Sequence, residues 1–276
     1  MFIAALDVGS VATKAILWAG REAGMVASSL VPSAWRPRAA AREALKRLRA
    51  ARPDIRPGLL ALTGYGRRLL GDEPTAEDDF GLGQIRSLSF NEISALARGL
   101  NLAAPELRLI LDVGGQDSKA LAIDENGRLL DFMLNDKCAA GAGAFIDGLC
   151  QSFDLDHQGF DALAGRGRPV PLSSMCAVFA QTELVAQIAK GVSRADLAAG
   201  IMASLAARLK AQCGRIFTQS PVALTGGLSR LPVFVDYLAK SLGVPVIVPP
   251  QAPYLAALGA ALMAWEQDSP PIDRQF

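Results

Sequence analysis

Two aspartates, each followed by a glycine two positions later and by a lysine seven positions later, are the residues here best suited to chemistry. Asp7 lies in LDVGSVATKA and Asp112 lies in LDVGGQDSKA, 105 residues further on. A glycine after a strand lets backbone N–H groups approach phosphate oxygens, because no Cβ intervenes. A carboxylate at the strand's end can hold Mg²⁺ directly or through water. One copy alone is more typical of a plain strand and turn, but two copies in register favour a phosphate site.

Two opposed turns of this kind are suited to the β- and γ-phosphates of a nucleotide, with a lysine as a point charge. A Thr-Gly-Gly turn at 225–227 is suited to holding the adenosine. The candidate ATP-binding residues are Gly9, Ser10, Thr13, Lys14, Gly114, Gly115, Gln116, Gly226 and Gly227. The candidate catalytic residues are Asp7, Asp112, Gln116 and Asp117, with Asp7 and Asp112 as magnesium ligands and Gln116 and Asp117 as candidates for orienting the attacking water.

A second internal repeat shows that the two halves differ in length. The segment ALTG occurs at 61–64 and again at 223–226, a separation of 162 residues. The second half has therefore gained 162 − 105 = 57 residues between its first strands and its last strand. Both Cys138 and Cys176 lie in that gained region.

These two cysteines share a local context. Cys138 lies in NDKCAAGAGAF and Cys176 lies in SSMCAVFAQTE, so capping residues precede both, and helices are predicted over 145–149 and 177–190. A thiol in the first turn of a helix is favoured as thiolate by the helix dipole and the free N–H groups. A small buried core residue is the alternative interpretation of a free cysteine.

Two cysteines in one chain cannot complete a four-thiolate site. The single histidine, His157, lies in a polar segment and adds no obvious ligand. A twofold dimer would supply 2 × 2 = 4 cysteines, and such a site holds either zinc or a [4Fe–4S] cluster. Cys150 and Cys213 fall among apolar helical positions, so we expect them in the core.

Composition excludes several classes of protein. The net charge is +1 over 276 residues, so no overall field attracts nucleic acid or a membrane surface. No apolar run reaches 18 residues and the N-terminus lacks a basic leader, so a cytoplasmic protein is expected. The arginine-rich segment 36–56 has helical spacing of its apolar residues. It predicts a surface helix, with a docking patch for an acidic partner protein as the alternative.

The elements that must position these residues are repeated as well. Each half begins with strand, glycine turn, strand, turn and strand. This pattern predicts a duplicated α/β fold with a nucleotide cleft between its halves. The first half comprises residues 1–104, closed by a C-terminal helix at about 255–270, and the second comprises 105–254 with the cysteine-bearing insertion.

The order of these motifs resembles that of the acetate kinase/sugar kinase/Hsp70/actin superfamily, whose halves are ribonuclease-H-like. More narrowly, DVGSVATK, LTGYGRRLL, LDVGGQDSKAL, NDKCAAGAGAF, SSMCAVFAQTE and LTGGLSRLP resemble the activator ATPases of 2-hydroxyacyl-CoA dehydratases, of the BadF/BadG/BcrA/BcrD type. The resemblance extends from about residue 3 to residue 265. Ordinary sugar kinases lack the cysteine-bearing segments.

The resemblance implies a homodimer that binds Mg·ATP and holds one [4Fe–4S] cluster through Cys138 and Cys176 of both chains. Hydrolysis would drive one low-potential electron from reduced ferredoxin or flavodoxin to an acceptor metalloprotein. That acceptor would be a 2-hydroxyacyl-CoA dehydratase, a ring reductase or a double-cubane-cluster protein. The alternatives are a small-molecule kinase of the same fold, acting for example on an amino sugar, and a nucleotide-binding scaffold without turnover.

Overall fold

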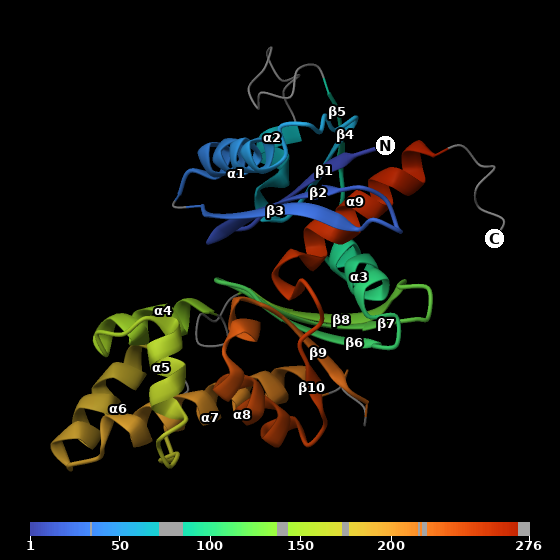
Figure 1. Cartoon of the computed structure of the whole chain (residues 1–276). Coiled ribbons are helices and arrows are strands. Elements are labelled where there is room, and N and C mark those ends of the chain that lie inside the picture. Colours follow the sequence, from blue (N-terminus) through green and yellow to red (C-terminus); the bar gives the residue numbers. More distant parts are fainter. Residues whose placement is uncertain are drawn as a thin grey trace. The chain divides into compact units, whose positions relative to one another are not determined.

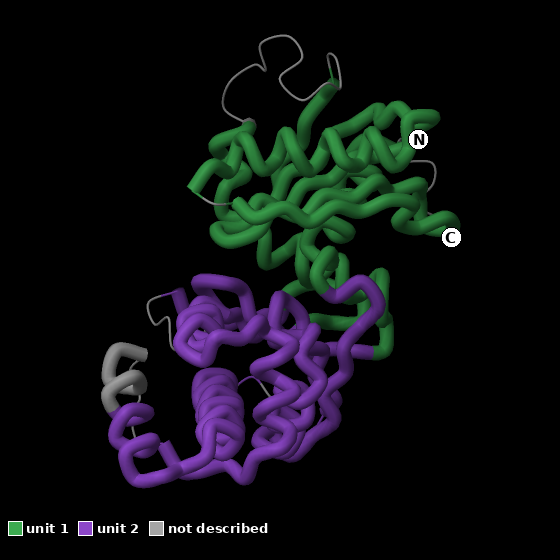
Figure 2. Tube along the Cα trace, turned by 60° about the vertical axis from the view of Figure 1, so that its left-hand side comes forward, with its two compact units in different colours: residues 1–106, 123–129, 253–276 green, residues 107–122, 130–252 purple. Residues whose placement is uncertain are grey.

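The computed structural model describes residues 1–33, 35–71, 85–136, 143–172, 177–214, 216 and 220–269 (Figure 1). Contacts between residues divide the chain into two compact units (Figure 2). Unit 1 contains Met1–Glu106, Ile123–Leu129 and the chain from Pro253 onwards, and unit 2 contains Leu107–Ala122 and Leu130–Ala252. Each unit is built around a five-stranded sheet.

The sheet of unit 1 has the strand order β3-β2-β1-β4-β5. Its strands are β1 (Ile3–Val8), β2 (Ala12–Trp18), β3 (Met25–Pro32), β4 (Leu59–Thr63) and β5 (Arg86–Ser89). Its helices are α1 (Pro37–Ala51), α2 (Arg68–Gly71), α3 (Glu92–Ala103) and α9 (Leu255–Asp268), with a 3₁₀ turn at Tyr65–Arg67. Strand β1 is buried along its whole length, because α1 and α9 both pack against this sheet.

The sheet of unit 2 has the order β10-β9-β6-β7-β8. Its strands are β6 (Leu109–Val113), β7 (Ser118–Ile123), β8 (Leu129–Asn135), β9 (Val222–Gly226) and β10 (Val246–Ile247). Its helices are α4 (Gly143–Ser152), α5 (His157–Ala164), α6 (Ala177–Ala189), α7 (Arg194–Cys213) and α8 (Pro232–Leu242).

The predicted duplication is present in the strand pairing. In unit 1, β1 pairs antiparallel with β2 and parallel with β4. In unit 2, β6 pairs antiparallel with β7 and parallel with β9. Asp7 pairs in register with Lys14 and with Thr63, and Asp112 pairs in the same way with Lys119 and Thr225. Residues 105 and 162 positions apart in the sequence therefore occupy corresponding places.

The extra length of the second half consists of helices. In unit 1 a single helix, α1, lies between β3 and β4, whereas α4, α5, α6 and α7 separate β8 from β9. The predicted helix after Cys176 is confirmed, since α6 begins at Ala177, and the helix predicted over 145–149 lies within α4.

Local sequence explains where several helices begin and end. The side chains of Asn91, Asp156 and Ser193 accept backbone N–H groups at the starts of α3, α5 and α7. Helix α1 is the amphipathic surface helix that the arginine-rich segment predicted, since Ala41, Leu45 and Leu48 are buried.

Helices α3 and α9 of unit 1 cross at two glycines. A Cβ on Gly99 would lie 1.9 Å from the carbonyl oxygen of Leu255, and one on Gly259 would lie 1.7 Å from that of Ala95. Neither position has room for a methyl group, because the obstructing atoms are backbone. The close approach of these backbones therefore requires glycine on both helices.

Gly259→Ala is expected to lower the free energy of unfolding by about 3 kcal/mol, because the new methyl group forces the two helices apart. Gly148→Ala is the matched control: Gly148 lies in α4 with open space around the added Cβ, so it should gain about 0.5–1 kcal/mol. Urea unfolding followed by circular dichroism measures both changes. Equal stability of Gly259→Ala and wild type would contradict the packing at this crossing.

No helix within the described part of the chain is both long and apolar enough to cross a membrane.

The core of unit 2 is a single large cluster that joins β6, β7 and β9 to α4, α5, α7 and α8. The predicted helix at about 255–270 is confirmed as α9. As boundaries of functional halves, 1–104 and 105–254 remain predictions.

Candidate functional site

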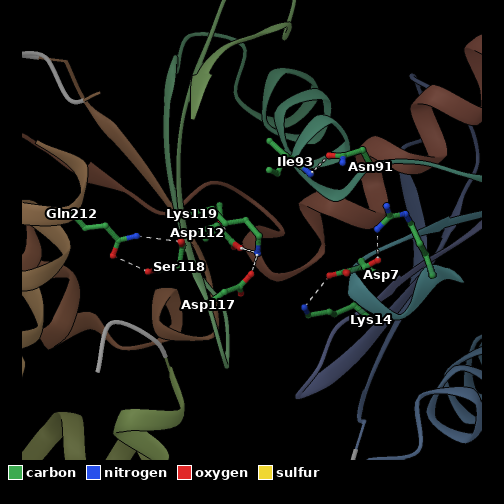
Figure 3. A network of polar contacts seen from close by, with 12 residues as sticks. Asp7, Lys14, Asn91, Ile93, Asp112, Asp117, Ser118, Lys119 and Gln212 are labelled. Carbon is green, nitrogen blue, oxygen red and sulfur yellow. Dashed lines mark hydrogen bonds and ion pairs between the residues drawn. The ribbon is translucent and has the colours of Figure 1, made fainter. Parts of the chain in front are cut away.

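The first Asp-Val-Gly turn joins β1 to β2 in unit 1. The carboxylate Oδ2 of Asp7 accepts a hydrogen bond from Lys14 Nζ at 2.9 Å, across the antiparallel pair (Figure 3). Asp7 is buried and Lys14 is partly exposed. Strand pairing brings these two side chains together, since Asp7 and Lys14 are register partners.

The other oxygen of Asp7 differs from the first. Asp7 Oδ1 is buried and accepts no hydrogen bond from the residues that the structure describes. Gly64, at the end of β4, has φ +88°, and a Cβ there would lie 2.5 Å from Asp7 Oδ1. A buried carboxylate oxygen without a donor is costly, and such a group needs an explanation. A bound cation or its water supplies one, because both satisfy a carboxylate oxygen.

The backbone of the first turn is held from within unit 1. Gly9 N–H donates to the carbonyl of Ala12 at 3.2 Å, and a Cβ on Gly9 would lie 2.7 Å from that oxygen. Thr13 Oγ1 is fully buried and lies 3.1 Å from Ser33 Oγ, which donates to the carbonyl of Gly9 at 2.7 Å. The candidate ligand Thr13 thus stabilises the turn through Ser33 and the Gly9 carbonyl, while Ser10 lies exposed in the turn.

The second turn joins β6 to β7 in unit 2. Lys119 Nζ lies 2.7 Å from Asp117 Oδ2 and 3.6 Å from Asp112 Oδ2, and the lysine side chain is only 5% exposed (Figure 3). A Cβ on Gly114 would lie 2.5 Å from Asp117 Oδ1, so this carboxylate folds back over the turn. Gln116 is exposed at the tip.

Strand β9 brings a third element to the second turn. Thr225 Oγ1 donates to Asp112 Oδ1 at 2.6 Å, and its side chain is fully buried. Gly226 follows with φ +81°, and a Cβ there would lie 2.2 Å from the carbonyl of Val113. The candidate adenosine residues Gly226 and Gly227 therefore begin at the end of β9, where Gly226 is the register partner of Val113 in β6.

Helix α4 is hydrogen-bonded to the second turn through its backbone. Gly143 N–H donates to the carbonyl of Gly114 at 2.8 Å, and Ala144 N–H donates to that of Gly115 at 2.7 Å. Residues at the start of a helix have N–H groups without intrahelical partners, and here the turn accepts two of them. On the other side, Gln212 of α7 exchanges hydrogen bonds with Ser118.

The predicted cluster ligands Cys138 and Cys176 lie outside the described residues. Within the described residues, no group of three or more His, Cys, Asp or Glu side chains is placed to hold a metal ion. Cys150 and Cys213 are free and buried, which confirms the prediction that they are core residues. Burial raises the pKa of the Cys150 thiol to about 11, with the charges of Asp147 and Asp156 adding to the effect.

A protein in which Cys138 and Cys176 are both serine should keep its two remaining thiols unreactive. Burial raises the pKa of Cys213 to about 12, so at pH 8 the thiolate of either core cysteine is about one part in a thousand or less. We expect no alkylation by iodoacetamide in the native protein and two alkylated thiols in urea, measured by intact mass. Rapid labelling of the native protein at pH 8 would contradict the buried positions.

The described residues fit a nucleotide phosphate and a cation at each turn. Both turns combine glycine backbone, a carboxylate at the strand's end and a lysine, the groups that bind phosphate oxygens and Mg²⁺. Gly64 and Ser33 were not among the predicted site residues, and Thr225 was predicted only as part of the adenosine turn, not as a partner of Asp112. The repeated ALTG segment could have indicated that Gly64 and Thr225 lie beside the two turns. No sequence pattern indicates the contact of Ser33 with Gly9.

Comparison with known proteins agrees with this geometry. The chain is 34% identical to the 2-hydroxyisocaproyl-CoA dehydratase activator of Clostridioides difficile, over 97% of this chain and 96% of that protein. It is 33% identical to the (R)-2-hydroxyglutaryl-CoA dehydratase activating ATPase of Acidaminococcus fermentans, over 95% and 96%.

Solved structures confirm the predicted fold class. The structure of the C. difficile activator with bound ADPNP superimposes with a TM-score of 0.85 at 32% identity, covering 97% of this chain and 95% of that one. A ROK family glucokinase from Streptomyces griseus shares the fold alone, with a TM-score of 0.57 at 13% identity, over 95% and 99%. The family match covers residues 6–264. The chain belongs to the BadF/BadG/BcrA/BcrD ATPase family.

Proposed function

We propose that this ATPase is a reductive activator that couples Mg·ATP hydrolysis to one-electron transfer into a partner metalloenzyme. The partner is a 2-hydroxyacyl-CoA dehydratase or a related enzyme. Support comes from the relatives matched over nearly their whole length, which are named as activators of such dehydratases. Another relative, named as a component of the benzoyl-CoA reductase of Thauera aromatica, extends the class of partner to ring reductases.

The observation that carries the proposal is the hydrogen-bonded connection between the second turn and α4. Gly114 and Gly115 are candidate phosphate-binding residues, and their carbonyls accept the N–H groups of Gly143 and Ala144. Only four residues separate Cys138 from Gly143 in the sequence. A change in the turn on ATP hydrolysis would therefore be passed by these hydrogen bonds to the start of α4, which follows Cys138 closely along the chain.

The proposed division of labour in ATP hydrolysis follows from the side chains. Glycine N–H groups of the turns bind phosphate oxygens, and Lys14 neutralises charge beside Asp7. Asp7 offers its unpartnered Oδ1 to Mg²⁺ or to a magnesium-bound water. Gln116 and Asp117 orient the attacking water. Magnesium, when bound, supplies charge stabilisation to the transferring phosphoryl group.

The redox part of the proposal rests on the cysteines of the sequence. Cys138 and Cys176 from two copies of this chain provide the four thiolates of one [4Fe–4S] cluster, which would supply one-electron chemistry. The homodimer, reduced ferredoxin or flavodoxin as electron donor, and a cytoplasmic location complete the proposal. Each of these parts depends on the family resemblance.

Anaerobic assay of the purified protein tests the function. With excess reductant and a dehydratase as acceptor, electron transfer should require Mg·ATP, and ADP should not replace it. ATP hydrolysis should proceed without any added sugar. An iron-free protein whose turnover depends on a hydroxyl-bearing small molecule would instead support a kinase of the same fold.

Gly143→Pro is expected to uncouple the nucleotide from the cluster. Proline removes the N–H that donates to Gly114 but is tolerated at the first position of a helix. In the wild type, an iron chelator should remove iron several-fold faster with ATP than with ADP, and this difference should shrink to about twofold or less in Gly143→Pro.

Gly143→Ala is the matched control, because it adds a Cβ near Gly114 O at 3.1 Å and keeps the N–H. Its ATP-to-ADP difference should stay close to that of the wild type. An unaltered difference in Gly143→Pro would remove this hydrogen bond from the coupling route.

A further inference from the structure

The two halves treat their aspartates differently, although the backbones correspond. In unit 2, Thr225 donates to Asp112 Oδ1 at 2.6 Å. In unit 1, the register counterpart Thr63 turns away from Asp7 and donates to the carbonyl of Phe90 at 3.2 Å. As a result, no residue in the described part of the chain donates to Asp7 Oδ1.

The lysines reinforce this difference. Lys14 makes a short hydrogen bond to Asp7, whereas Lys119 lies 3.6 Å from Asp112 and makes its short contact, 2.7 Å, with Asp117. Asp7 is therefore fixed by its lysine and Asp112 by its threonine. A hydrogen bond to a carboxylate is among the stronger ones in proteins, so Thr225 restrains the Asp112 side chain at Oδ1, while the longer ion pair of Lys119 acts at Oδ2.

From these contacts we infer that Thr225 is a positioning residue for ATP hydrolysis, acting through Asp112. The Thr225 side chain is 0% exposed, so its hydroxyl reaches no ligand and its effect passes through the carboxylate it holds. By occupying Oδ1, it leaves Oδ2 of Asp112 as the oxygen that faces Lys119 and the turn. Thr63 has no such role. The inference deepens the proposed function and rests on its ATP hydrolysis.

Kinetics of four proteins test this role. Thr225→Val keeps the side-chain volume and removes the donor, so kcat for Mg·ATP hydrolysis should fall about 10- to 100-fold while KM for ATP changes less than about threefold. Thr225→Ser keeps the hydroxyl and should recover to within about threefold of the wild type. Thr63→Val, the matched control, should stay within about threefold, although it also loses a buried hydrogen bond.

A second measurement needs no nucleotide and no turnover. Urea midpoints are compared for Thr225→Val, Asp112→Ala and the double variant, and for Thr63→Val, Asp7→Ala and their double variant. The double variant of Thr225 and Asp112 should shift the midpoint by less than the sum of the two single shifts, because each single substitution already removes the same hydrogen bond. The second pair should lie closer to the sum of its single shifts than the first pair, because Thr63 and Asp7 share no hydrogen bond.

The outcomes separate this inference from the proposed function. Absent Mg·ATP turnover in the wild type would overturn both. Normal turnover in Thr225→Val, equal loss in Thr225→Ser or Thr63→Val, or additive midpoints in the first pair would overturn the positioning role alone. If Thr225→Val does not fold, Thr225→Cys, whose thiol is a weak donor, is measured in its place with the same expected order of rates.

Discussion

Asp7→Asn protein is expected to hydrolyse Mg·ATP at least about 100-fold more slowly than the wild type. Asp7 Oδ1 is buried without a donor, while Oδ2 is held by Lys14, so the carboxylate presents one oxygen to a cation. Asparagine keeps the shape and loses the charge that attracts Mg²⁺. Asp112→Asn should also lose turnover, and steady-state phosphate release measures both.

The control for Asp7→Asn must remove a negative charge and an ion pair at a position away from the first turn. Asp54→Asn meets this requirement, because Asp54 is exposed and pairs with Arg52 in the same unit. Its turnover should equal that of the wild type. Wild-type turnover in Asp112→Asn would remove that carboxylate from the mechanism, and wild-type turnover in Asp7→Asn would leave its unpartnered oxygen unexplained.

Cys138→Ser and Cys176→Ser are each expected to abolish iron binding. The anaerobic wild-type dimer should carry about four iron and four sulfide, which are lost on exposure to air. Loss of either cysteine leaves two of four thiolates in a twofold dimer, too few to hold the cluster. Iron and sulfide analysis and the visible absorbance measure the effect.

Cys150→Ser is the matched control, since Cys150 is a buried core thiol in the same unit. It should lose a little stability and keep its iron. Loss of the chromophore in Cys150→Ser would contradict the ligand assignment, as would bound zinc in the anaerobic wild type.

The sequence alone determined the duplicated strand–turn–strand units, and therefore which residues lie at the two turns. Such units depend on contacts between neighbours in the chain, so alternation of apolar residues and glycine turns predicts them. The pairing of Asp7 with Lys14 and of Asp112 with Lys119 follows from those hairpins, because register places them opposite each other. Helix α9 and the core positions of Cys150 and Cys213 were also readable from helical spacing.

Tertiary structure alone decided how each aspartate is held. Thr63 and Thr225 occupy identical tetrapeptides, yet one donates to Phe90 and the other to Asp112. The choice depends on which acceptor the rest of each unit brings within hydrogen-bond distance, 27 residues away for Thr63 and 113 for Thr225. No local pattern encodes a contact of that range.

The same holds for the connection between the second turn and α4, and for the glycine crossing of α3 and α9. Gly143 and Gly99 look like ordinary small residues in the sequence. Their roles depend on backbone atoms that come close only after the chain has folded: the carbonyl of Gly114 for one, and that of Leu255 for the other. Sequence periodicity indicated where the proposed catalytic groups lie in the chain. Long-range packing set their hydrogen bonds, since side-chain orientation follows from neighbours distant along the chain.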